Sequence, residues 1–213
     1  MYIELHACSS FSFLEGSSSP EELAAEAARL GYSALALLDR DGLYGAPRFY
    51  KACRETGIRS IVGAEISLPE GRLPLLVENR RGYRNLCRLI TDLQLRSPKG
   101  EGRTSLEELG PLSEGLVCLT GGTHGPLRRR LDESFDSAYA YLLKLKQTMG
   151  DGNVYVEIQR HFDRRQERFN QALKALARKA RLPLIAANGV RYASPSGRLL
   201  HDVLTCIRHH TTL

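Results

Sequence analysis

The sequence has no tryptophan, few other aromatic residues and no long apolar segment. Aromatic side chains make up 7% of its 213 residues and are not interleaved with the basic groups, so a platform for stacking nucleic-acid bases is unsupported. No apolar run approaches the roughly 20 residues that a membrane-spanning helix needs. The chain opens on a strand pattern, without the basic and then apolar segments of a secretion signal. We therefore expect a cytoplasmic location and no membrane partner.

Cysteine is also scarce. Five cysteines stand far apart, at positions 8, 53, 87, 118 and 206, and no two of them form a Cys-x-x-Cys pair. An odd number at such wide spacing argues against a disulfide framework and a zinc ribbon.

Basic residues outnumber acidic ones, 30 to 24, which gives a net charge of +6. Arginine-rich groups occur at residues 80–88, 128–130 and 160–168. Such groups can follow a phosphate backbone, or they can form a solvated surface with scattered salt bridges. The sequence leaves open whether these groups contact DNA.

Strand and helix patterns alternate along the whole chain. We predict strands at about residues 2–6, 34–38, 59–68, 73–77, 116–119, 153–158 and 184–187. Helical patterns lie between them; the first has Ser19 as its N-cap, Pro20 at its first position and Glu22 completing a capping box. Seven strands separated by helices predict an α/β fold with a mainly parallel sheet, closed as a βα barrel in a single domain over residues 1–213. Chemistry in such a barrel lies where strands end.

The first strand ends in His6-Ala7-Cys8, and this ending allows two interpretations. Side chains at i and i+2 of a strand share a face, and imidazole and thiolate are both zinc ligands, so the pair could begin a metal site. Alternatively, His6 is a hydrogen-bonded core residue and Cys8 is a buried apolar one.

The same stretch resembles the opening motif of the polymerase and histidinol phosphatase (PHP) family, in which a strand ends in His-x-His-Ser. The continuation Phe-Ser-Phe-Leu-Glu-Gly at 11–16, followed by Ser-Pro-Glu-Glu-Leu at 19–23, resembles the N-terminal PHP domain of bacterial C-family DNA polymerases, above all their error-prone alpha-subunit branch. The resemblance covers nearly the whole chain. It implies a distorted, TIM-like barrel of seven βα units, in agreement with the strand pattern.

Metal-binding members of the family gather His, carboxylate and sometimes Cys side chains around two or three divalent ions that activate water against a phosphate ester. The resemblance places five positions of that pattern on competent ligands, namely His6, Glu15, Asp39, Glu65 and His161. Five other positions depart from the pattern, namely Cys8, Arg40, Arg72, Gly189 and Arg191.

Three of these departures put arginine where the family has histidine. Guanidinium stays protonated and has no lone pair to donate, so it repels a cation instead of binding it. We therefore expect a degenerate site without metal, in which Arg40, Arg72 and Arg191 pair with Asp39, Glu15 and Glu65, and Glu65 is held by Arg40 or Arg191. Any metal that did bind would be zinc or manganese on a reduced set of ligands, namely His6, Cys8, Glu15, Glu65 and His161.

The leading interpretation is a catalytically silent PHP domain with a structural role in an error-prone DNA polymerase that acts in DNA replication and repair. Its partners would be the polymerase domains of the same parent chain and, through them, DNA. No cluster of acids for nucleotide transfer is recognisable in these 213 residues, so polymerase activity would belong to another part of the parent. Two alternatives stay open: an active metal-dependent phosphoesterase or 3'-5' exonuclease, and a module that binds anions or nucleic acid without catalysis.

Overall fold

The computed structural model describes residues 2–98 and 100–213 and divides the chain into two compact units. The first unit joins the chain up to Ala64 with residues 188–213, and the second comprises residues 65–187. Among the described residues, seven strands follow one another in the order β1-β2-β3-β4-β5-β6-β7, and helices lie between all consecutive strands except β3 and β4, which a short turn joins. The predicted α/β fold class is therefore confirmed.

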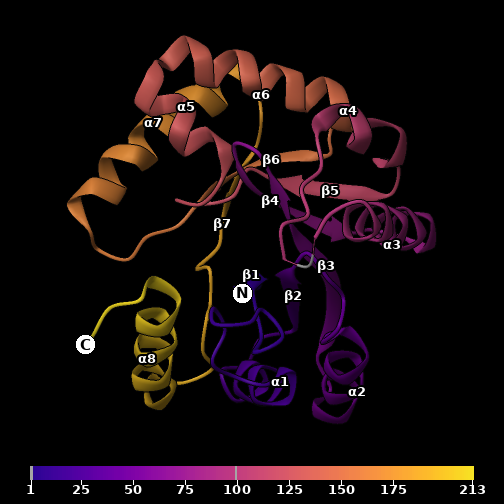
Figure 1. Cartoon of the computed structure of the whole chain (residues 1–213), viewed down its shortest axis with the longest axis vertical. Helices are drawn as coiled ribbons and strands as arrows, with labels where there is room; N and C mark the ends of the chain where they lie inside the picture. The colour runs from indigo at the N-terminus through magenta and orange to yellow at the C-terminus, as the bar shows by residue number, and fades with distance from the viewer. Residues whose placement is uncertain (1, 99) are drawn as a thin grey trace. The chain divides into compact units, whose positions relative to one another are not determined.

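The first unit is built on β1 (Glu4–Ala7), which pairs in parallel with β2 (Ala34–Arg40). Helices α1 (Pro20–Arg29) and α2 (Ala46–Thr56) pack against each other, and α8 (Arg198–His209) follows a 3-10 turn at Pro195–Gly197 (Figure 1). Strand and helix side chains together form the apolar core of this unit, made of Ala7, Leu23, Ala24, Ala27, Leu35, Leu37, Phe49, Ala52, Cys53 and Ile58.

Local sequence signals set the ends of these helices. The Ser19 side chain accepts a hydrogen bond from the Glu22 backbone amide, and the Glu22 carboxylate accepts one from the Ser19 amide at 2.7 Å. This is the predicted capping box, and it satisfies two amides that a helix start leaves without partners. Helix α2 ends at Gly57, whose φ of +78° is a left-handed conformation that glycine adopts without steric cost.

Strand β3 (Arg59–Leu68) runs from the first unit into the second. The second unit continues with the elements β4 (Gly71–Val77), α3 (Arg80–Leu95), α4 (Leu106–Leu109), a 3-10 turn at Gly110–Leu112, β5 (Leu116–Leu119), α5 (Pro126–Glu133), α6 (Phe135–Met149), β6 (Val154–Ile158), α7 (Arg164–Ala180) and β7 (Leu184–Ala186). Helix α6 packs against both α5 and α7 (Figure 1). Leu142 and Leu145 on α6 and Leu173 on α7 are fully buried, so this packing supplies much of the unit's core.

The structure departs from the sequence prediction at two points. Strand β4 pairs with β5 in antiparallel orientation, whereas β5, β6 and β7 pair in parallel. An apolar strand pattern carries no information about direction, so this could not be read from the residues. Helices α4 and α5 were also missed, because α4 is a single turn and α5 carries three consecutive arginines that obscure its apolar period.

Among residues 2–98 and 100–213, no helix has both the length and the apolar character that crossing a membrane would require.

Candidate functional site

The loop between β1 and α1 folds back on itself and buries an acidic side chain. Backbone hydrogen bonds from Glu15 and Gly16 to the Ser12 carbonyl, and from Ser10 to the Ser18 carbonyl, close this loop. A Cβ atom at Gly16 would lie 2.1 Å from the Ser9 carbonyl oxygen, so only glycine allows so close an approach. The result is that the Glu15 side chain, although it comes from a connection, is only 2% exposed.

Three guanidinium groups of the first unit surround the Glu15 carboxylate. Arg40 Nη1 lies 3.1 Å from Glu15 Oε1, and Arg208 Nη1 lies 3.8 Å from the same oxygen. Arg191 Nη1 lies 3.5 Å from Oε2. Both carboxylate oxygens are thus engaged by cations that come from the end of β2, from the segment after β7 and from α8.

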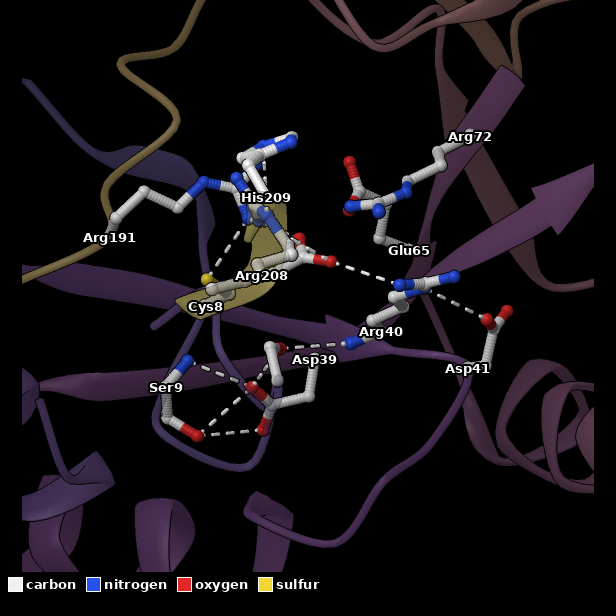
Figure 2. A network of polar contacts seen from close by, with 12 residues as sticks. Cys8, Ser9, Asp39, Arg40, Asp41, Glu65, Arg72, Arg191, Arg208 and His209 are labelled. Atoms are coloured by element: carbon white, nitrogen blue, oxygen red, sulfur yellow. Dashed lines mark hydrogen bonds and ion pairs between the residues drawn. The ribbon is translucent and has the colours of Figure 1, made fainter. Parts of the chain in front are cut away.

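Neighbouring groups share two of these arginines. Arg40 Nε also lies 3.4 Å from a carboxylate oxygen of Asp41, and Arg191 Nη1 donates to Cys8 Sγ at 3.1 Å (Figure 2). Cys8 is buried, and its backbone amide donates to the Val190 carbonyl at 3.0 Å. The end of β1 and the segment after β7 are therefore joined by both backbone and side-chain contacts.

Asp39, at the end of β2, has serine partners. The Ser9 amide and hydroxyl and the Ser12 hydroxyl all donate to its carboxylate at 2.8 to 3.0 Å (Figure 2). Burial raises the pKa of Asp39 above its usual value, and these hydrogen bonds partly offset that shift. The expectation that Asp39 pairs with an arginine is wrong, because the Ser12 hydroxyl also accepts the Arg40 backbone amide and the loop encloses the carboxylate.

His6 and Gly189 lie close to this network in the first unit. His6 is buried on β1, and its backbone amide donates to Glu4 Oε1 at 2.8 Å. Glu4 Oε2 accepts the Asn188 backbone amide at 2.8 Å, which fixes the start of the segment that carries Gly189 and Arg191. Gly189 has a φ of +62°, a left-handed conformation that disfavours most other residues.

In the second unit, Glu65 on β3 is buried and pairs with Arg72 on β4, with Arg72 Nη1 3.2 Å from Glu65 Oε2 (Figure 2). We had expected Arg40 or Arg191 as the partner of Glu65, but the pair that the structure shows is with Arg72. Adjacent strands joined by a short turn bring these two side chains together. His161 lies in the exposed connection after β6, where Gln166 contacts its ring Nδ1 at 2.9 Å.

Among the described residues, no three His, Cys, Asp or Glu side chains are arranged so that they could hold a metal ion. Sequence reasoning missed three residues of the Glu15 and Asp39 networks, namely Ser9, Ser12 and Arg208. Ser9 and Ser12 belong to the opening motif and could have been considered as hydrogen-bond donors. Arg208 carries no local signal, because it is one of many arginines near helix ends.

Comparison with known proteins identifies the family of the chain and several relatives. The family model described as "PHP domain" matches residues 4–161. Error-prone DNA polymerases of Mycolicibacterium paratuberculosis and Pseudomonas syringae pv. tomato are 39% and 37% identical to the chain, and each match covers all of it. The chain spans about a fifth of the length of these relatives, 21% and 20%.

Among the solved structures that match the chain, two illustrate the shared fold. One is a proposed metal-dependent phosphoesterase from Bifidobacterium adolescentis, with a TM-score of 0.61 over 91% of this chain and 89% of the other. The other is an amidohydrolase from Chromobacterium violaceum with bound sulfate and no metal, with a TM-score of 0.60 over 90% of this chain and 88% of the other. Both are 14% identical to the chain, so they are similar to it in fold alone.

Proposed function

The chain belongs to the PHP domain family, and on that premise we propose that it is the PHP domain of an error-prone DNA polymerase, with a degenerate metal site and a structural role. Relatives with that name match the chain over its whole length, and about four fifths of their own length lies outside the match. We infer that nucleotide transfer and most contact with DNA belong to those other parts of a parent chain. The domain would then act as a folded support for them.

The main support for this proposal is the set of guanidinium groups around the Glu15 carboxylate. This residue stands where polymerase PHP domains have an acidic ligand, yet its oxygens face Arg40, Arg191 and Arg208. Two unit charges about 4 Å apart interact by roughly 4 kcal/mol at an effective dielectric constant of about 20. One divalent ion at that distance from a guanidinium group would therefore be repelled by about twice that energy, and each further guanidinium group would add to the repulsion. The residues present in the first unit do not fit a divalent metal.

The other donors in the first unit support the same conclusion. Cys8 Sγ accepts a hydrogen bond from Arg191, and the Asp39 carboxylate is occupied by two serine residues. In the second unit, the carboxylate of Glu65 is paired with Arg72. Within each unit, polar partners from the chain thus engage side chains that the resemblance assigns to the family's ions, which supports our proposal that this domain carries out no metal-dependent hydrolysis.

The test measures bound metal and hydrolysis together. The purified chain is incubated with zinc or manganese and desalted, its metal content is measured by plasma mass spectrometry, and hydrolysis of bis(p-nitrophenyl) phosphate is measured in parallel. We expect far less than one ion per chain and no hydrolysis above a buffer blank. One or more tightly held ions per chain, lost in His6→Ala together with phosphodiesterase activity, would instead establish the active phosphoesterase.

A further inference from the structure

Two of the arginine groups that the sequence contains lie together in the second unit. Residues 128–130 are in the first turns of α5, and residues 160–168 form the connection after β6 and the start of α7. Arg128 Cζ lies 5.4 Å from the centre of the Phe169 ring on α7, so the two groups meet through a direct cation–π contact. Figure 1 shows α5 beside α7 within this unit.

Acidic residues neutralise only some of these arginines. Arg128 pairs with Asp132, Arg130 with Glu133 and Arg160 with Glu167. Within residues 2–98 and 100–213, no carboxylate lies within the 4.0 Å of an ion pair from the remaining four, which are Arg129, Arg164, Arg165 and Arg168. All four are exposed, so they carry fixed positive charge that no carboxylate of the described residues pairs with.

An exposed aromatic side chain lies between Arg160 and Arg164 in the sequence. Phe162 is 91% exposed, and its backbone φ of +61° lies in the left-handed region, which is costly for a bulky residue. Arg160 Cζ lies 5.8 Å from the centre of its ring. Phe162 lies between Arg160 and Arg164, so the expectation that aromatic residues are not interleaved with basic groups does not hold at this position.

We propose that Phe162, Arg129, Arg164, Arg165 and Arg168 form a surface that binds single-stranded DNA. The four guanidinium groups would contact successive phosphates, and the Phe162 ring would stack on a base. A single strand fits better than a duplex, because the faces of bases in a duplex are already stacked on one another. It also fits better than an acidic peptide, which would use the charge but leave an exposed ring without a role. The proposal goes beyond the structural role described above and does not depend on it.

The test is fluorescence anisotropy of a labelled oligo(dT) of about 20 nucleotides titrated with the 213-residue chain at several salt concentrations. One variant replaces Arg129, Arg164, Arg165 and Arg168 with glutamine. Its matched control loses the same charge at four exposed arginines that already have carboxylate partners, namely Arg29, Arg48, Arg81 and Arg88. Circular dichroism establishes that both variants are folded.

The variants should separate specific contacts from net charge. Each phosphate contact with a single strand contributes about 0.7 to the slope of log affinity against log salt, so the first variant should flatten that slope by about 3, while the control keeps most of it. Phe162→Ala should weaken binding by roughly 5- to 100-fold at every salt concentration, because stacking is not ionic. Equal losses in the two charge variants, or a Phe162→Ala variant that binds as wild type does, would overturn the proposal. Equally tight binding of poly-glutamate would also overturn it, since it would mark a general polyanion surface.

Discussion

Replacing Glu15 by glutamine removes one negative charge from among three guanidinium groups and keeps the volume of the side chain. The carboxylate is 2% exposed, and Arg191 is 19% exposed. Arg40 and Arg208 keep 37% and 31% of their side-chain surface in water. The change therefore isolates the charge of Glu15 and leaves three cations close together without their common partner.

The loss of stability expected for Glu15→Gln depends on how deeply the charged groups are buried. Removing one partner of a buried ion pair costs about 3–5 kcal/mol, mainly because the remaining charge is left in a poor environment. Arg40 and Arg208 can regain water, so we expect the lower end, a loss of about 3 kcal/mol. In a chain of this size each 1 kcal/mol lowers the melting temperature by about 2–4 °C, which gives a decrease of about 6–12 °C.

Differential scanning calorimetry is the appropriate measurement, because it separates the melting of two compact units if they do not unfold together. The control is Glu26→Gln, which breaks an exposed pair with Arg29 on α1 and should lower the melting temperature far less than Glu15→Gln does. A Glu15→Gln variant that melts within about 2 °C of wild type would refute the idea that Glu15 holds these cations together.

A double variant tests the contact with α8 directly. Adding Arg208→Gln to Glu15→Gln removes one of the stranded cations, so the double variant should be more stable than the sum of the single changes predicts. Strict additivity would show that Arg208, at 3.8 Å, is not energetically coupled to Glu15.

Three further predictions concern other polar contacts. Glu65→Gln should lower the free energy of unfolding by about 2–4 kcal/mol in urea denaturation, because it removes the negative charge that pairs with the mostly buried Arg72; a loss below about 1 kcal/mol would contradict this. Ser12→Ala should cost about 1–3 kcal/mol by the same measurement, since it removes a donor to the buried Asp39 carboxylate, and Ser12→Thr should recover part of the loss. A hydrogen bond from the Arg96 guanidinium lowers the pKa of Glu108 from 4.5 to about 2. The stability that Glu108 contributes is therefore present above pH 4.5 and is lost as the pH falls toward 2. The melting temperature of Glu108→Gln should accordingly fall less than that of wild type across this pH range.

Much of the secondary structure could be predicted from local patterns. Strand β3 begins and ends at the predicted residues, the Ser19 capping box forms, and Gly57 ends α2. These features depend on residues a few positions apart, whose geometry is fixed by the backbone and by the helix or strand period. The resemblance of the opening motif to PHP domains also predicted the family, and the match of the PHP domain model to residues 4–161 confirmed it.

The partners of the charged residues were less predictable. The sequence indicated that buried carboxylates and arginines would meet, but it gave Asp39 an arginine and left Arg208 out. In the structure, the Asp39 carboxylate accepts from Ser9 and Ser12, and Arg208 reaches Glu15 from a helix far away in the sequence. Each of the 24 arginines carries the same positive charge and can pair with any carboxylate, so charge alone does not select a partner.

The sequence by itself therefore determined the α/β class, the ends of several elements and the family. Only the tertiary structure decided which guanidinium lies beside which carboxylate, that β4 and β5 run antiparallel, and that two arginine groups meet through Arg128 and Phe169. The physical reason is that local order depends on a few neighbouring torsions and hydrogen bonds, whereas contacts between distant residues depend on how whole elements pack their apolar faces. Polar side chains then take the partners that this packing brings within reach.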